Sequence, residues 1–189
     1  MANATNVSTG KPKPNGAVYR APLPATLPTD AASALDSAFA ELGFVSDDGV
    51  TNANSADSED VYAWGGTPVL NLLTEKSDEW TLTLIESLNP NVLKTVYGDG
   101  NVTISGNLVT VKAGATQLDN SAYVIDMALK NGALKRIVIP SGALGEVGEI
   151  VYKDDEAIGY QITIKAMDDG SGYTHYEYIQ LPAAAEGSA

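Results

Sequence analysis

Short segments in which apolar and polar residues alternate, separated by turn residues, recur along this sequence. The clearest is the run 79–86, in which every second residue from Trp80 to Leu84 is apolar. An extended segment of this kind has one apolar face, which is typical of a strand that packs one side on a core. The run 69–74 precedes it, and the polar residues between the two runs have the length of a hairpin loop. The sequence therefore predicts a central β-hairpin.

Further strand-like runs follow toward the C-terminus. They are 101–105, 108–112, 121–129, 133–140, 149–153, 157–167 and 173–181. The connections Gly106-Asn107 and Asn131-Gly132 are typical of hairpin turns. About eight to ten short strands with turns between them predict a mainly β fold, either an antiparallel β-sandwich or a partly rolled barrel.

Two short flanking α-helices are predicted beside the strands. Residues 31–42 carry apolar side chains at helical spacing after a possible N-cap at Thr29-Asp30. Residues 91–97 follow Pro90, which suits the first position of a helix, and precede Gly98, which suits its end.

Three other regions lack a regular pattern. Residues 1–29 are rich in proline, which fixes φ and removes a hydrogen-bond donor, so we expect an extended N-terminal arm. The acidic and polar stretch 46–60 predicts a long inter-strand loop, which we expect to be mobile in a single chain and ordered by contacts between chains. The predicted organisation is an arm (1–29), a β-domain (30–182) and a flexible C-terminal tail (183–189).

The charge balance argues against a grip on nucleic acid. The chain has 24 acidic and 11 basic residues and a net charge of −13, whereas binding to phosphates requires clustered Lys and Arg. This acidity serves either solubility or a functional acidic surface. No apolar run approaches the roughly 20 residues of a membrane-spanning helix, and the N-terminus lacks a signal-peptide pattern. We expect a soluble protein with no membrane partner.

No residue pattern indicates catalysis or a cofactor. The single histidine, His175, has no accompanying Gly-x-Ser-x-Gly motif and too few possible zinc ligands, so we expect it to be structural. The chain has no cysteine, and its Gly-x-Gly pairs do not continue into a nucleotide-binding pattern. The many carboxylates allow a glycosidase, but nothing selects a pair of them. We predict a protein that is not an enzyme and has no catalytic, cofactor-binding or metal-binding residues.

Several pieces of the sequence, in their order and spacing, carry a family resemblance. They are 34–50, Ala63-Trp64-Gly65-Gly66, Leu84-Ile85-Glu86 and Val96-Tyr97-Gly98. Together they resemble the major tail protein of long-tailed, non-contractile bacteriophages, particularly those of actinobacterial hosts, and the match extends over 18–181.

The resemblance implies a structural virion protein that forms hexameric rings. The rings stack into a hollow tail tube, assembled in the host cytoplasm, through which double-stranded DNA passes without specific binding. Other copies of the chain and the tail terminator, tape measure and distal tail proteins would be its partners. Six copies with a net charge of −13 would give −78 per ring.

Candidate site residues follow from this tube interpretation. The long loop and the residues after it would supply ring or inter-ring contacts, through Asp47, Asp48, Asn52, Asn54, Asp57, Tyr62 and Trp64. The acidic residues on predicted strands would face the lumen, namely Glu79, Glu86 and Asp126. We expect the glycines of Trp64-Gly65-Gly66 to form a sharp bend, and both tryptophans to be buried in the core or at a seam between subunits.

Four alternatives stay open on the sequence alone. A tail terminator or a capsid decoration protein would share an acidic, all-β composition. A carbohydrate-binding β-sandwich would suit the aromatic residues, and a glycosidase is the enzyme alternative.

Overall fold

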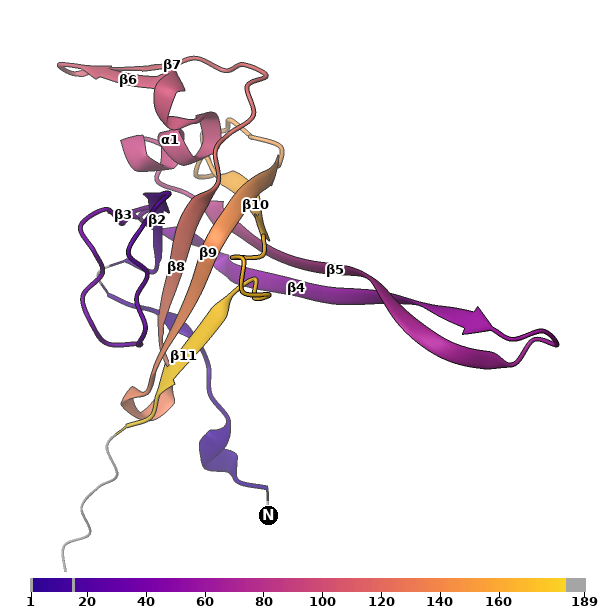
Figure 1. The fold of residues 1–189 in the computed structure, drawn as a ribbon. Coiled ribbons are helices and arrows are strands. Elements are labelled where there is room, and N and C mark those ends of the chain that lie inside the picture. Colours follow the sequence, from indigo (N-terminus) through magenta and orange to yellow (C-terminus); the bar gives the residue numbers. More distant parts are fainter. Residues whose placement is uncertain (1, 15, 183–189) are drawn as a thin grey trace, which may run out of the picture.

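The computed structural model describes residues 2–14 and 16–182, and antiparallel strands dominate it (Figure 1). Nine strands form one sheet in the order β3-β2-β8-β9-β10-β5-β4, with β1 beside β8 and β11 beside β9. Their bounds are β1 (Lys11–Pro12), β2 (Val18–Pro22), β3 (Ala40–Glu41), β4 (Val45–Tyr62), β5 (Pro68–Leu84), β8 (Ser121–Ala128), β9 (Leu134–Val147), β10 (Tyr160–Ala166) and β11 (Tyr176–Gln180).

A smaller sheet and one α-helix complete the described part of the chain. The small sheet pairs β6 (Val102–Ser105) with β7 (Leu108–Val111), and the helix is α1 (Pro90–Tyr97). Single 3-10 turns lie at Ala4–Asn6, Asp99–Asn101 and Lys130–Gly132. The predicted mainly β, antiparallel fold is confirmed. Within the described residues the sheets do not close into a barrel, which favours the sandwich over the partly rolled barrel.

Strand β8 lies between two apolar clusters. Tyr123 and Ile125 belong to the larger cluster, which also contains α1 and the inner faces of β5 and β10. Ala122 and Val124 belong to a second cluster on the opposite face. Because successive side chains of a strand point to opposite faces, both faces of β8 are covered, and its first six residues are all buried.

Helix α1 forms as the sequence predicts. Asn89 is its N-cap, and the side chain of Asn89 accepts a hydrogen bond of 3.0 Å from the backbone N–H of Asn91. Pro90 occupies the first turn, where its missing N–H costs nothing. The helix ends at Gly98, whose φ of 97° favours glycine. Its buried side chains pack into the larger apolar cluster.

The helix predicted over 31–42 does not form. The carboxylate of Asp30 accepts hydrogen bonds from the backbone N–H groups of Ala32 and Ser33, which holds the chain in a turn. The carbonyl oxygens of Asp30 and Ser33 accept hydrogen bonds from Arg136 instead of from later residues of a helix. Of the apolar residues at helical spacing, Ala31, Phe39 and Leu42 are nevertheless buried and Leu35 is partly buried. The spacing therefore indicated burial and not a helix.

The predicted loop 46–60 is also wrong. It lies within β4, which pairs with β5 along nearly its whole length. The turn of the central hairpin was predicted at the wrong place. Residues 75–78 belong to the continuous strand β5, and the turn lies between β4 and β5, at 63–67. This part of the hairpin lacks the apolar alternation that identifies a strand, and polar cross-strand pairs hold it together instead. One example is the pair of hydroxyls of Ser55 and Ser77, which lie 2.8 Å apart.

Two smaller differences concern the predicted arm and one predicted strand. Part of the predicted N-terminal arm, residues 18–22, is β2, which lies inside the sheet between β3 and β8. The strand predicted at 149–153 is irregular, whereas β10 and β11 lie within the predicted runs 157–167 and 173–181. The flexible tail predicted for 183–189 lies outside the described residues.

Candidate functional site

The β4–β5 hairpin projects far beyond the body of the protein (Figure 1). Every second residue of β5 from Asp78 to Leu84 is buried, whereas Pro68 to Lys76 are all exposed. On β4 the residues from Thr51 to Tyr62 are exposed without interruption. At about 3.3 Å per residue, this exposed segment spans about 40 Å. The base of the hairpin is thus part of the core, and its outer half touches solvent on both faces.

The outer half carries large apolar side chains that the chain itself does not cover. They are Val61, Tyr62, Trp64, Val69, Leu70, Leu72 and Leu73. Leu72 and Leu73 are neighbours on one strand and therefore point to opposite faces of the hairpin. An exposed apolar surface of this kind marks an interaction site, because a soluble monomer rarely presents one.

The tip of the hairpin is a turn that depends on glycine. Gly65 and Gly66 have φ values of 106° and 85°, a region that residues with a side chain rarely adopt. The backbone N–H of Ala63 donates to the carbonyl of Thr67 over 2.8 Å and closes the turn. Trp64 is fully exposed at this tip, so it is not a core residue of its own chain. The predicted bend at the glycines is confirmed.

A buried carboxylate fixes the base of the hairpin. Asp78 Oδ1 accepts a hydrogen bond of 2.7 Å from Asn52 on β4, and Oδ2 accepts one of 2.6 Å from the hydroxyl of Thr174. Nδ1 of His175 lies 2.5 Å from Oδ2. Burial alone would raise the pKa of Asp78, but these hydrogen bonds lower it below its ordinary value of 3.8. One carboxylate therefore ties β4 and β5 to the segment before β11.

The two tryptophans differ in environment. Trp80 is buried beside this cluster, and its ring meets that of His175 edge to face with 5.2 Å between centroids. The prediction that Trp80 is buried is confirmed. The structural role predicted for His175 agrees with its place in this cluster, where it contacts a carboxylate and an aromatic ring.

The hairpin also holds more than half of the net negative charge. Residues 45–84 contain eight carboxylates and a single basic residue, Lys76, and so contribute −7 to the net −13. The carboxylates are Asp47, Asp48, Asp57, Glu59, Asp60, Glu75, Asp78 and Glu79. Lys76 contacts the side-chain oxygen of Asn54 on the opposite strand. Outward from Lys76 the hairpin has only acidic charge.

The seven residues predicted to form contacts between chains all lie on this hairpin. Asp47 and Asp48 are near its base, where with Glu149 and Glu156 they line an open acidic depression. Asn52, Asn54, Asp57 and Tyr62 follow along β4, and Trp64 is at the tip. The exposed apolar residues of β5 opposite them, Val69, Leu70, Leu72 and Leu73, were not among the predicted contact residues. In the sequence they form a run that is apolar at nearly every position, which a strand with one covered face does not need.

Two of the three acidic residues predicted to face a lumen are partly exposed. Glu79 forms an ion pair of 3.4 Å with Lys165. Glu86 accepts hydrogen bonds from the backbone N–H of Phe44 and from the side chain of Asn89. Its carboxylate therefore joins the segment before β4 to the N-cap of α1 and already has two hydrogen-bond donors.

Asp126 cannot line a lumen, because it is buried in an ion cluster. Its two oxygens accept hydrogen bonds of 2.6 and 2.8 Å from Arg136, and Lys13 lies 2.9 Å from Oδ2. Burial would raise the pKa of Asp126, but the hydrogen bonds from Arg136 and Lys13 lower it. Strand alternation did not distinguish an outward acidic residue from a buried one with a basic partner.

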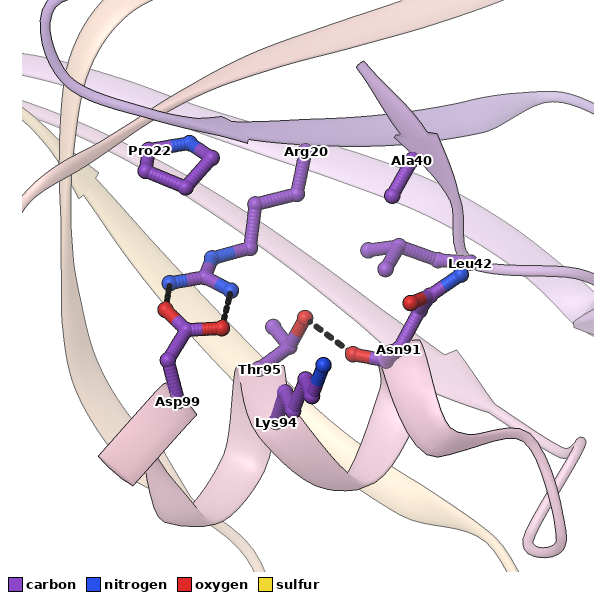
Figure 2. Close-up of a pocket in the computed structure, with 8 residues that line it drawn as sticks. All are labelled: Arg20, Pro22, Ala40, Leu42, Asn91, Lys94, Thr95 and Asp99. Atoms are coloured by element: carbon purple, nitrogen blue, oxygen red, sulfur yellow. Dashed lines mark hydrogen bonds and ion pairs between the residues drawn. The ribbon is translucent and has the colours of Figure 1, made fainter. Parts of the chain in front are cut away.

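A pocket of about 180 Å³ lies between α1, β2 and β3 (Figure 2). It is lined by Arg20, Pro22, Ala40, Leu42, Asn91, Lys94, Thr95 and Asp99. Arg20 binds both oxygens of Asp99, at 3.1 and 2.7 Å. Hydrogen bonds from Arg20 hold the pKa of Asp99 below its ordinary value. Sequence reasoning did not find this pocket, because its walls come from segments far apart in the chain.

The described residues contain no group of three or more side chains suited to hold a metal ion. No helix among them has the length and apolar character needed to cross a membrane.

A comparison with protein families matches residues 3–187 to the family described as phage tail tube protein. A search of curated proteins found no match.

Proposed function

The chain belongs to the phage tail tube protein family, and from this premise we propose that its copies form hexameric rings that stack into the hollow tube through which DNA leaves the virion. As a member of this family it is a structural component of the virion tail and not an enzyme. Its partners include further copies of itself and other tail proteins, among which we propose the tail terminator, the tape measure protein and the distal tail protein.

The observation that carries this proposal is the hairpin with exposed apolar side chains on both faces. A second copy of the chain that covers these side chains would remove them from water, with a gain of about 25 cal/mol per Å² of apolar surface buried. Because the surface is present in every copy, the contact repeats, and repetition is what a ring or tube requires.

We propose that the residues along β4 and at the tip, from Asn52 to Trp64, contact neighbouring subunits together with Leu70, Leu72 and Leu73 of β5. This replaces the idea of a loop that becomes ordered on assembly. The hairpin is already paired strand to strand, so assembly has less conformational entropy to overcome than ordering a loop would require.

The experiment is electron microscopy of purified protein, compared with a variant that has a shortened hairpin. Ala56 and Lys76 are cross-strand partners, so an Asn-Gly turn between them replaces 57–75 without changing the register. We expect tubes or rings from the full chain and monomers from the shortened one, with similar melting midpoints. Tubes of normal length from the folded, shortened chain would overturn the role of the hairpin.

A matched control changes an exposed apolar residue outside the hairpin. Tyr152 is exposed in the irregular segment before β10, and Tyr152→Ser should leave assembly as in the unaltered chain. Loss of assembly in this control would mean that exposed apolar residues in general, and not the hairpin, drive association.

A further inference from the structure

The pocket in Figure 2 contains a basic side chain that forms no ion pair. Arg20 is neutralised by Asp99 through two hydrogen bonds. Lys94 lines the same pocket and is half-buried, but its Nζ has no hydrogen bond or ion pair among the described residues. A carboxylate bound to a half-buried ammonium would form a favourable ion pair, because the attraction between the charges is stronger where solvent is partly excluded.

Lys94 has no direct ion-pair partner among the described residues although the chain has more than twice as many acidic as basic residues. Asp99, whose pKa Lys94 helps to lower, is already bound to Arg20. Only Lys11, Lys94, Lys112 and Lys130 lack a side-chain partner among the described lysines. Of these four, only Lys94 lines the pocket. The pocket also has apolar walls, from Pro22, Ala40 and Leu42, and so fits a ligand with a carboxylate next to an apolar group.

The outer half of the hairpin carries that combination. Glu59 on β4 and Leu72 on β5 are direct cross-strand partners, so their side chains lie on the same face. Both are exposed, and the carboxylate of Glu59 has no partner among the described residues. Two hairpins would repel each other, since each has only acidic charge in this region.

The hairpin cannot reach the pocket of its own chain. In Figure 1 it extends away from the body on the side opposite to β2 and β3, which form one wall of the pocket. A contact between the two must therefore join two copies.

We propose that the pocket between α1, β2 and β3 receives side chains from the outer half of the hairpin of a second copy, with Glu59 bound to Lys94 and Leu72 against the apolar wall. The proposal rests on the tube function proposed above and names the receiving surface. The contact joins unlike surfaces of two copies, and such contacts propagate into closed rings or helical arrays instead of stopping at a dimer.

The test uses two charge-reversed variants of the full chain, Lys94→Glu and Glu59→Lys, followed by sedimentation and electron microscopy. Each alone places like charges together at every contact, and we expect the protein concentration needed for assembly to rise about tenfold or more. In an equimolar mixture, the reversed pocket of one variant meets the reversed hairpin of the other, so the charges at that contact are again opposite. The unaltered pocket and the unaltered hairpin in the mixture also meet with opposite charges. The mixture should therefore assemble at a protein concentration at which neither variant assembles alone.

Controls distinguish loss of the proposed contact from loss of folding and from the effect of a changed net charge. Lys112→Glu makes the same charge change at a lysine outside the pocket and should assemble normally. Glu59 is exposed, so Glu59→Lys tests the contact without threatening the core. Normal assembly of Lys94→Glu, or failure of the mixture when both variants are folded, would overturn the contact but leave the tube function standing. No assembly of the unaltered chain at any concentration would overturn the tube function itself.

Discussion

The carboxylate of Asp78 lies 2.5 Å from Nδ1 of His175 at the point where β5 leaves the body of the protein. The two residues are far apart in the sequence, and the contact joins the base of the hairpin to the segment before β11. Since Asn52 of β4 also donates to this carboxylate, one side chain joins both strands of the hairpin to the segment before β11. This contact adds to the pairing of β5 with β10, which begins at the next residue, Glu79, in fixing the direction in which the hairpin projects.

We predict that Asp78→Ala loosens the base of the hairpin. The change removes the acceptor that Asn52 shares with the partly buried Thr174 and His175, which should make local opening of the hairpin base easier by about 1–3 kcal/mol. Hydrogen exchange should become faster for the backbone amides of β4 from residue 51 outward and stay unchanged in β8 and β9. Asp78→Asn, which keeps one acceptor oxygen, should have a smaller effect. Uniformly faster exchange in all strands would show a global loss of stability and no specific role at the hairpin base.

The buried cluster around Asp126 predicts a dependence of stability on pH. The pKa of Asp126 in the folded protein lies below its ordinary value of 3.8. Its contribution to stability is therefore complete above that value and is lost as the pH falls through the folded-state pKa. Asp126→Asn leaves Arg136 buried without a charged partner and should cost about 3–5 kcal/mol at neutral pH. The difference in free energy of unfolding between Asp126→Asn and the unaltered chain should become smaller in acid.

Chemical denaturation between neutral pH and about pH 2, which lies below the range where exposed carboxylates titrate, measures this difference. Asp155→Asn is the control, because Asp155 is exposed and has no partner among the described residues. It should match the unaltered chain at each pH. A constant gap between Asp126→Asn and the unaltered chain across the whole range would contradict the prediction.

The core strands were predictable because the alternation of apolar and polar residues alone identifies a strand with one buried face. In β5 the alternation from Trp80 to Leu84 reports burial on one face, and the structure buries those residues. Residues with a restricted or unusual backbone conformation were equally reliable guides. Pro90 and Gly98 marked the ends of α1, and Asn131-Gly132 marked a turn. In each case the information lies within a few residues of the element.

The hairpin was not predictable, because its outer half has no covered face. Alternation arises only where one side of a strand packs on a core, and β4 from Thr51 to Tyr62 is exposed on both. The polar stretch then looks like a loop. The prediction for Asp126 was wrong for a different reason. Lys13 is distant in the sequence, and Arg136 lies directly opposite Asp126 on the adjacent strand β9. Neither partner can be read from the alternation within β8 alone.

The two tryptophans should respond to substitution in opposite ways. Trp80→Ala removes a buried ring and should lower the free energy of unfolding by about 3–5 kcal/mol. Trp64→Ala removes a fully exposed ring and should leave the melting midpoint unchanged, but it should weaken assembly. Calorimetry and sedimentation of both variants check this pair. Normal tubes from Trp64→Ala would exclude the tip from the contact between subunits.

The prediction that acidic residues face the lumen is tested best at Glu79, which is partly exposed on β5. An acidic lumen would offer DNA no phosphate contacts, whereas added lysines would bind phosphates and release counterions. Glu79→Lys changes the charge by +2 per copy, and we expect particles that carry it to eject DNA more slowly, most clearly at low salt, where screening is weakest.

Lys165 provides the matched control for this last prediction, because it is the ion-pair partner of Glu79. The double variant Glu79→Lys with Lys165→Glu restores both the net charge and an ion pair of opposite orientation. If charge on this wall sets the drag on DNA, the double variant should eject faster than Glu79→Lys alone. Equal ejection rates for the single variant and the unaltered particle at low salt would show that Glu79 does not act on passing DNA, and the acidity would then serve solubility.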